Sequence, residues 1–417
     1  MTTKNNIPAG YKDSAVGIIP QEWDVKRVKD LGSVITGSTP PTADVSNYGS
    51  EYMFVSPADL SDNQKYVLST EKMLSSKGYA ISRKMPKGTI LYTCIGSTIG
   101  KIGIASRELT SNQQINAVIC NDKTEYLYYA LLFTTGRIKM LAGEQAVPII
   151  NKSEFENIKL AVPPIEEQRK IAEILGVWDE AIEKQSRLIE KLELRKRALM
   201  QHLLTGRTRL SGFTSPWQKV KLGEIGKTYN GLTGKSKEDF EDGNAKFIPY
   251  INVFFNEKVN IDKLGVVSVD ESEKQNKVQY GDIFFTVSSE TPDEVGMASV
   301  LLEYIDDTYL NSFCFGYRLN DFETLNPIFA SYILRGDRFR NYMMVLAQGS
   351  TRFNISKNEV MKLRIELPSL SEQKAIAEVL TMADKEIATH RKKLDALRLQ
   401  KRGLMQQLLT GKTRVKI

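Results

Sequence analysis

The stretch "VPPIEEQRKIAEIL" (residues 162–175) returns as "LPSLSEQKAIAEVL" (residues 367–380). The match continues without a gap for 49 positions, of which 22 are identical. It ends at "LLTGRTRL" (residues 203–210) and "LLTGKTRV" (residues 408–415). Chance does not produce agreement over this length, so the sequence indicates an internal duplication.

The duplication extends upstream of these segments. Trp23 heads "WDVKRVKDLGSVITG" and Trp217 heads "WQKVKLGEIGKTYNG", a shift of 194 positions. "KGTILYT" (residues 87–93) matches "YGDIFFT" (residues 280–286) with a shift of 193. The chain therefore consists of two tandem repeats, each a globular domain followed by a long repeated segment. The predicted parts are a first domain at 1–161, a central long helix at 162–205, a second domain at 206–366 and a C-terminal long helix at 367–411.

Both repeated segments carry apolar residues in steps of three and four, which is the a/d pattern of a coiled coil. Proline precedes each segment, and Gly206 or Gly411 stands where a helix would end. Each helix is expected to be about 39 residues, or roughly 58 Å, long. The predicted seam consists of Ile171, Leu175, Trp178, Ile182, Ile189, Leu192, Leu199 and Leu203, then Ile376, Leu380, Ile387, Leu394, Leu397, Leu404 and Leu408.

An exposed apolar stripe of this length needs a partner, and the other copy is the nearest candidate. Two similar units related by a two-fold axis would pair their helices antiparallel. The register that places polar against polar residues pairs Gln185 with Lys401, Lys196 with His390, and Leu192 with Leu394. The alternative is two separate helices, each packed on its own domain.

The domains themselves mix short β-like runs such as "GTILYTCIG" and "NSFCFGYRL" with helical stretches. The fold class is therefore α/β: two similar α/β domains separated by a two-helix antiparallel coiled coil in a pseudo-two-fold internal repeat. The net charge of +7 is compatible with a polyanion partner without requiring one. No apolar run reaches the length of a membrane span, and no signal peptide is evident, so a cytoplasmic protein with no membrane contact is expected.

Catalytic signatures are absent from the sequence. The three cysteines are far apart and form no CxxC pair, so neither a disulfide framework nor a metal site is expected. The two histidines, His202 and His390, align with Gln407 and Gln185, which favours helix-surface roles for both. We therefore expect no catalytic residues and no enzyme activity in this chain.

One loop, "GSTIGKI" (residues 96–102), has a faint likeness to a phosphate-binding loop. It has three residues between the glycines instead of four, and Ile102 stands where Ser or Thr would bind magnesium. The equivalent stretch of the second repeat has lost both glycines and the lysine. An ordinary loop is the expected structure, and no cofactor is expected in this chain.

Two similar domains joined by two similar long helices resemble the specificity (S) subunit of Type I restriction–modification systems. The resemblance covers essentially the whole chain. It is carried by "IPQEWDVKRVKDLG" with "TGSTPPT", by "KGTILYTCIGSTIGKIGIAS" and by "INKSEFENIKLAVPPIEEQRKIAEIL". The second repeat departs modestly, with "LPSLSEQ" for "VPPIEEQ" and no clear counterpart of "GSTPP".

The resemblance implies that each globular domain is a target recognition domain reading one half of a split, asymmetric site in double-stranded DNA. It implies that the helix pair sets the gap between the halves and docks two modification (methyltransferase) subunits. Restriction subunits, which are ATP-dependent endonucleases, would join the complex. S-adenosylmethionine, ATP and magnesium would belong to these partner subunits.

Comparing the repeats predicts which loops read DNA, because two identical readers would recognise identical halves. Divergent polar loops should therefore hold the contacts, with Arg and Lys facing phosphate or guanine and Asn facing adenine. The candidates in the first domain are Thr36, Ser38, Thr39, Ser97, Thr98 and Lys101. The candidates in the second domain are Thr233, Lys235, Lys237, Ser289, Arg352 and Asn354. Solvated surface loops are the competing interpretation at each of these positions.

Two other functions remain open. The chain could be an adaptor without DNA affinity, whose helix pair assembles other proteins. It could also be a stand-alone DNA-modifying enzyme, which would require methylation by the purified chain with S-adenosylmethionine. A steep loss of DNA affinity with salt would separate a DNA reader from an adaptor.

Overall fold

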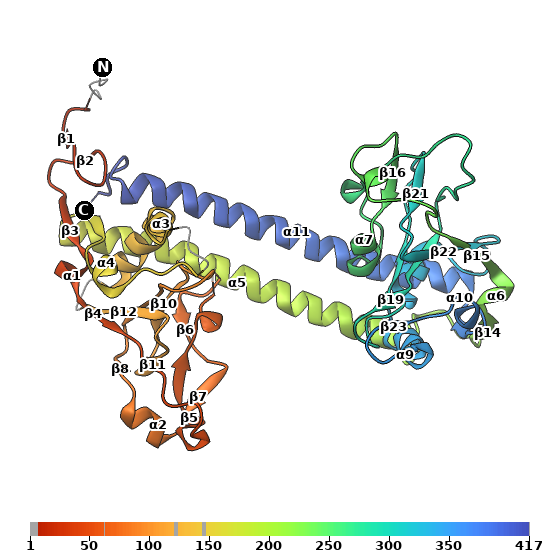
Figure 1. Ribbon diagram of the computed structural model, residues 1–417, viewed down its shortest axis with the longest axis horizontal. Helices are drawn as coiled ribbons and strands as arrows, with labels where there is room; N and C mark the ends of the chain where they lie inside the picture. Colours follow the sequence, from red (N-terminus) through yellow and green to blue (C-terminus); the bar gives the residue numbers. More distant parts are fainter. Residues whose placement is uncertain (1–6, 62, 121–123, 144–146, 417) are drawn as a thin grey trace. The chain divides into compact units, whose positions relative to one another are not determined.

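The computed structural model describes residues 7–61, 63–120, 124–143 and 147–416 (Figure 1). The chain divides into two compact units: unit 1 is Met1–Ile189 with His390–Ile417, and unit 2 is Glu190–Thr389. Each unit combines one globular domain with part of both long helices. The sequence had predicted four consecutive segments and did not anticipate this grouping.

The domain of unit 1 is built around a five-stranded sheet of order β4-β12-β9-β10-β6, in which only the β10–β6 pair is parallel. All four residues of β9 are buried, as expected for a central strand covered on both faces. These strands are β4 (Ser33–Thr36), β6 (Tyr66–Val67), β9 (Ile90–Thr93), β10 (Ile102–Ala105) and β12 (Ile115–Ile119).

A second, four-stranded sheet of order β7-β5-β11-β8 and two small antiparallel pairs, β1–β2 and β3–β13, complete the strands of unit 1. The strands of the second sheet are β5 (Tyr48–Val55), β7 (Lys72–Leu74), β8 (Lys84–Met85) and β11 (Leu109–Ser111). The paired strands are β1 (Tyr11–Lys12), β2 (Ile19–Pro20), β3 (Asp24–Arg27) and β13 (Lys159–Val162). The shorter helices are α1 (Val28–Leu31), α2 (Ser76–Ile81), α3 (Thr124–Leu141) and α4 (Lys152–Glu156).

The domain of unit 2 repeats this plan. Its antiparallel sheet has the order β15-β22-β18-β20, which corresponds to β4-β12-β9-β10, and all four residues of β18 are buried. A three-stranded sheet, β17-β16-β21, repeats the β7-β5-β11 core of the second sheet of unit 1, with one antiparallel and one parallel pair in both. These strands are β15 (Gly226–Asn230), β16 (Ala245–Ile248), β17 (Gly265–Val267), β18 (Ile283–Thr286), β20 (Ala298–Val300), β21 (Thr308–Leu310) and β22 (Cys314–Leu319).

Two short antiparallel pairs, β14–β24 and β19–β23, complete the strands of unit 2. They are β14 (Gln218–Lys221), β19 (Ser288–Ser289), β23 (Phe353–Asn354) and β24 (Arg364–Leu367). The shorter helices are α6 (Leu222–Ile225), α7 (Tyr250–Phe255), α8 (Pro327–Ile333), α9 (Asp337–Leu346) and α10 (Lys357–Val360). Helices α8 and α9 stand where unit 1 has the single helix α3.

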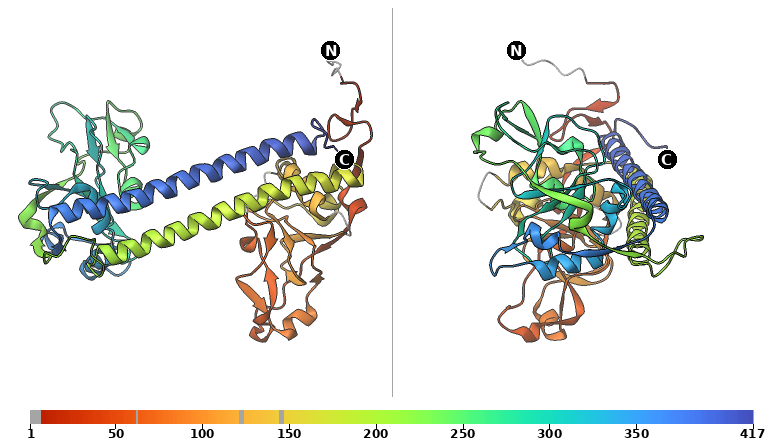
Figure 2. Two further views of the ribbon diagram at one scale, coloured as in Figure 1. Left: turned by 180° about the vertical axis from the view of Figure 1, so that it is seen from behind. Right: turned by 90° about the vertical axis from the view of Figure 1, so that its right-hand side faces the viewer.

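The two long helices are α5 (Ile165–Leu203) and α11 (Leu370–Leu409), of 39 and 40 residues. Within each unit, the part of α5 lies alongside the part of α11 (Figures 1 and 2). In unit 1, Asp179 contacts Lys401 and Gln185 contacts His390. Numbers that rise along α5 therefore fall along α11, so the helices are antiparallel.

The predicted register is wrong. Gln185 donates hydrogen bonds to the backbone oxygen of His390 at 2.9 Å and meets its Nδ1 at 2.8 Å, so it faces its own repeat counterpart and not Lys401. Leu394 packs with Ile182 and Ile189. The physical reason is that the lysine of each seam is drawn to an aspartate that the a/d pattern did not count as a seam residue.

Most of the predicted seam residues lie in three clusters. Those at the two ends of each helix enter the domain cores, whereas Ile182, Ile189, Leu394 and Leu397 form a small cluster between the helices. Ile171, Leu175 and Leu408 belong to the core of unit 1. Leu203, Ile376 and Leu380 belong to the core of unit 2. In the part of the chain that the structure describes, no helix is long and apolar enough to cross a membrane.

Candidate nucleic-acid interface

The end of β4 and the loop after it bring together three predicted contact residues of unit 1. Thr36 donates a hydrogen bond to Asn116 at 2.7 Å, and Thr39 donates to the side chain of Gln113. The backbone amide of Arg83 donates to Ser38 Oγ at 2.9 Å. The three hydroxyl groups therefore belong to one polar surface that also includes residues from two other segments.

The second predicted loop of unit 1 holds Ser97, which is exposed, and Thr98 and Lys101, which are half-buried. The ammonium group of Lys101 donates a hydrogen bond to the backbone oxygen of Pro57 at 3.1 Å. Ile95 forms an isolated β-bridge with Ile149, so this loop lies beside the segment that leads into α4.

Unit 2 makes the equivalent bridge as a short ladder. Ser288 pairs with Asn354, and Ser289 pairs with Phe353. The side chain of Ser289 is buried and donates to Glu294 at 3.1 Å, whereas Arg352 and Asn354 are exposed. The structure thus brings Ser289 next to the segment of Arg352 and Asn354, which lies more than 60 positions away in sequence.

Lys235, by contrast, is engaged within its own domain. Its side chain is 7% exposed and binds Glu273 at 2.5 Å. The hydrogen bond from Lys235, together with backbone and Gln275 hydrogen bonds, lowers the pKa of Glu273 to about 2. Thr233 is held by Gln275, whose side chain donates to the Thr233 backbone oxygen at 2.8 Å, while Lys237 is exposed. Lys235 therefore stabilises the loop that presents Thr233.

Each domain is attached to the long helices by a duplicated polar cluster. In unit 2, Lys196 of α5 binds Asp384 of α11 at 2.8 Å and lies over the ring of Tyr332, whose hydroxyl donates to Asp384 at 2.6 Å. Lys258 also binds Asp384, at 3.0 Å. Burial acts to raise the pKa of Asp384, but hydrogen bonds from Lys196 and Tyr332 outweigh it, so its pKa lies below the ordinary value.

Unit 1 contains the same cluster. Lys401 of α11 binds Asp179 of α5 and lies over the ring of Tyr129, which donates to Asp179. Lys65 contacts the hydroxyl of Tyr129 at 3.4 Å, as Lys258 contacts that of Tyr332. Each cluster joins one domain, its own helix and the helix of the other repeat.

A second duplicated contact explains the repeated "TGRTR" and "TGKTR" phrases. Arg414 binds Glu167 at the start of α5, at 2.8 and 3.0 Å, and the indole of Trp23 donates to the same carboxylate at 2.9 Å. Arg209 binds Glu372 at the start of α11, at 2.5 and 2.6 Å. Both glutamates are about 1% exposed or less. The arginine of each phrase therefore neutralises a buried carboxylate at the start of the long helix of the other repeat.

A family model for the Type I restriction modification DNA specificity domain matches the chain twice, over residues 20–194 and 214–399. The chain belongs to the family of Type I specificity subunits. The MjaVIII specificity subunit of Methanocaldococcus jannaschii is 28% identical over 414 residues, which cover 95% of this chain and 94% of that protein. The MjaIX specificity subunit of the same organism is 33% identical over 264 residues, covering 58% of this chain and 60% of that protein.

Solved structures show the same fold. A Type I S subunit from M. genitalium has a TM-score of 0.54 at 17% identity and covers 98% of both chains. A chain from a structure describing complex assembly and conformational transition of the type I R-M system has a TM-score of 0.59 at 17% identity, covering 95% of this chain and 99% of that one. The two matches to the family model identify the two globular domains as the target recognition domains of a specificity subunit.

The sequence missed several residues of these target recognition domains. Arg83, Gln113 and Asn116 contact the predicted residues of the first domain, yet none of the three was among the candidates. Gln275 and Glu273 play the same part in the second domain. Only one feature of the sequence could have pointed to Gln275 and Glu273, which is that they lie in a stretch where the two repeats diverge. Among the described residues, no group of His, Cys, Asp and Glu side chains could hold a metal ion.

Proposed function

We propose that this specificity subunit reads a bipartite, asymmetric DNA site, with one target recognition domain on each half. Duplication with divergence supports this most directly. The strand order of the sheet cores repeats between the units, while the loops after β4 and β15 and those around residues 95–101 and 288–295 differ in sequence and hydrogen bonding. A shared scaffold with different polar loops suits two readers of different base-edge patterns.

The spacing between the halves would be set by α5 and α11. A helix of 39 residues is about 58 Å long at 1.5 Å per residue, enough to bridge half-sites one turn of DNA apart. The duplicated clusters at Asp179 and Asp384 would hold each domain at a defined place on the helices. The same helices would dock two methyltransferase subunits.

The chain itself would carry out no chemistry. Methylation with S-adenosylmethionine would belong to the methyltransferase subunits, and ATP-dependent cleavage with magnesium would belong to restriction subunits that join the complex. The expected place of action is the cytoplasm, where this complex would act on the host's own DNA.

The test is co-expression with the cognate methyltransferase subunit, followed by mapping of methylated adenines in host DNA. The expected pattern is a two-part motif with a fixed gap, absent when either subunit is omitted. Methylation without the partner would identify this chain as an enzyme. A single uninterrupted motif would argue against two separate readers.

A further inference from the structure

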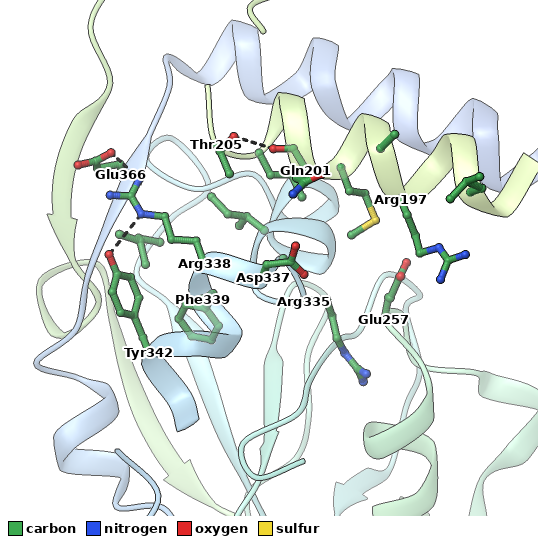
Figure 3. A pocket seen from close by; sticks show the side chains of 17 residues that line it. Arg197, Gln201, Thr205, Glu257, Arg335, Asp337, Arg338, Phe339, Tyr342 and Glu366 are labelled. Atoms are coloured by element: carbon green, nitrogen blue, oxygen red, sulfur yellow. Dashed lines mark hydrogen bonds and ion pairs between the residues drawn. The ribbon is translucent and has the colours of Figure 1, made fainter. Parts of the chain in front are cut away.

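Unit 2 has an open groove at a place where unit 1 has almost none. A cavity of about 570 Å³ lies between the C-terminal part of α5, α9 and β24 (Figure 3). The cavity at the equivalent place in unit 1, between α3, β13 and the end of α11, measures about 60 Å³. The repeat relates their walls directly: Leu204 and Thr205 correspond to Leu409 and Thr410. The two sites are therefore copies of the same groove, which is open in unit 2 and almost closed in unit 1.

In unit 1 the groove is filled by the chain's own N-terminal segment. Val16, Ile18 and Ile19 line it, and Ile19 is 2% exposed. The β1–β2 hairpin holds this segment, and the Tyr11 hydroxyl donates to the backbone oxygen of Gly411 at 2.8 Å. Phe133 adds an aromatic ring to the wall.

Unit 2 lacks both fillers. Gly336 aligns with Phe133, given that Tyr332 aligns with Tyr129, so no side chain occupies that place. The linker between α5 and Trp217 also corresponds to two separate segments of unit 1, the one before Trp23 and the one after α11. Arg209, in the first part of this linker, binds Glu372, and the remaining residues lead directly into β14. Too few residues remain to form an equivalent of the N-terminal hairpin.

The walls of the open groove favour an apolar, uncharged occupant. Four of the lining residues are buried apolar side chains: Leu204, Ile333, Phe339 and Ile365. The side chains of Arg197 and Gln201, on α5, are exposed (Figure 3). Two of its carboxylates already bind basic side chains, because Arg338 binds Glu366 at 2.6 Å and Lys196 binds Glu257 at 3.0 Å. The other charged side chains of the lining, Arg197 and Asp337, are exposed to solvent.

Arg335 does not make this groove an anion site. Its guanidinium group donates four hydrogen bonds, to the backbone oxygens of Ala298, Val253, Phe254 and Asn256. Its hydrogen-bonding capacity is therefore largely used in holding α7 and β20. An occupant of the groove would therefore be recognised mainly by its shape and by apolar contacts.

We propose that this groove receives an extended apolar segment of the methyltransferase subunit, with bulky aliphatic side chains flanking a small residue, as in Val16–Gly17–Ile18–Ile19. This rests on the proposed function, which supplies the partner. The occupant's chemistry comes from unit 1, where a segment of that kind fits the same groove. A second copy of this chain is a less favourable occupant. If its N-terminal segment moved into the groove of unit 2, it would leave the corresponding groove of its own unit 1 open.

The first test is photo-cross-linking in the intact complex. A photoreactive amino acid replaces Gln201, on the groove rim, in chain co-expressed with the methyltransferase subunit, and cross-linked peptides are identified by mass spectrometry. The expected product joins residue 201 to an extended, aliphatic segment of that subunit. A complex that assembles and methylates DNA but gives no such cross-link would overturn the proposal while leaving the proposed function intact.

The second test fills the groove. A Cβ at Gly336 would lie 3.3 Å from the backbone oxygen of Ile333 and 3.5 Å from Leu204 Cδ1, so we expect the ring of Gly336→Phe to lie against the groove wall, at the position that aligns with Phe133 of unit 1. We expect at least tenfold weaker binding of the methyltransferase subunit, with the melting temperature maintained. Gly136→Phe, at a helix position with no neighbour within 4 Å, is the control.

Ala198→Phe fills the groove from the exposed face of α5 and serves if Gly336→Phe does not fold. Unchanged binding by a folded, groove-filled variant would overturn the proposal. Failure of the wild-type chain to bind the methyltransferase subunit at all would instead remove the proposed function, and the inference with it.

Discussion

Lys196 of α5 binds Asp384 of α11 at 2.8 Å, and the residues related to them by the repeat, Lys401 and Asp179, form the same ion pair in the other unit. A 205-residue shift converts one pair into the other and exchanges the helices that supply the two charges. Each unit therefore makes the same contact with the roles of α5 and α11 exchanged. In each unit this ion pair lies next to a tyrosine of the globular domain, at the contact between the domain and the long helices. We call it the ionic lock.

Removing the lysine of this pair should destabilise unit 2. The two side chains are 15% and 28% exposed, so Lys196→Met should cost about 1–2 kcal/mol, between the values for exposed and fully buried pairs. Urea unfolding of the single variants and of Lys196→Met/Asp384→Asn gives a double-mutant cycle. Coupling below about 0.5 kcal/mol would show that the pair is not a lock. Lys191→Met, at an exposed position of the same helix, is the control.

The arginines of the repeated phrases should matter far more than their basic neighbours. Arg209→Ala leaves the buried carboxylate of Glu372 without its partner and should clearly lower the free energy of unfolding. Arg207→Ala, two positions away and exposed, should cost less than about 0.5 kcal/mol. Arg414→Ala and Lys412→Ala form the matched pair in unit 1. Equal losses within either pair would contradict the role assigned to the arginine.

The glycine before each divergent loop leaves no room for a side chain. A Cβ at Gly231 would lie 2.2 Å from the backbone oxygen of Asn311, and one at Gly37 would lie 2.0 Å from that of Asn112. Alanine at either position should therefore lower stability by about 1–3 kcal/mol. Gly403→Ala, inside α11 with no neighbour within 4 Å, should raise stability by about 0.5–1 kcal/mol. Thermal unfolding of the three variants tests this. The melting temperature should fall for alanine at Gly37 or Gly231 and rise for Gly403→Ala, and a change of the same sign in all three would contradict the prediction.

Acid should release the loop that Lys235 holds. The pKa of Glu273 is lowered from 4.5 to about 2, chiefly by the hydrogen bond from Lys235. A carboxylate with a lowered pKa stabilises the folded state above its unfolded pKa, and that contribution is lost as the pH falls from about 4.5 toward 2. NMR titration of the Glu273 carboxyl carbon measures the pKa directly. Lys235→Met should bring it back toward 4.5, and an unchanged titration would exclude the ion pair.

The sequence predicted the elements that depend on local periodicity. The heptads placed both long helices within a few residues of α5 and α11, because an apolar stripe interrupted by proline and glycine specifies a helix and its ends. The runs "GTILYTCIG" and "NSFCFGYRL" became the strands β9 and β22.

The helix register and the site environments could not be obtained in this way. Tyr129 and Tyr332 reach the helices from the domains and draw Asp179 and Asp384 into contact with the lysines, a three-body arrangement that one-dimensional heptad counting does not contain. Lys235 looked like a free cation because its partner, Glu273, lies 38 positions away. Individual DNA contacts stay predictions at all twelve candidate positions.

The central claim is that each target recognition domain specifies its own half of the DNA site. Residues 206–366 are replaced by the equivalent domain of another specificity subunit, the hybrid is co-expressed with the methyltransferase subunit, and methylated adenines are mapped across host DNA. The account predicts that one half of the motif changes while the other half and the gap stay the same. A motif in which both halves change, or neither does, would contradict it.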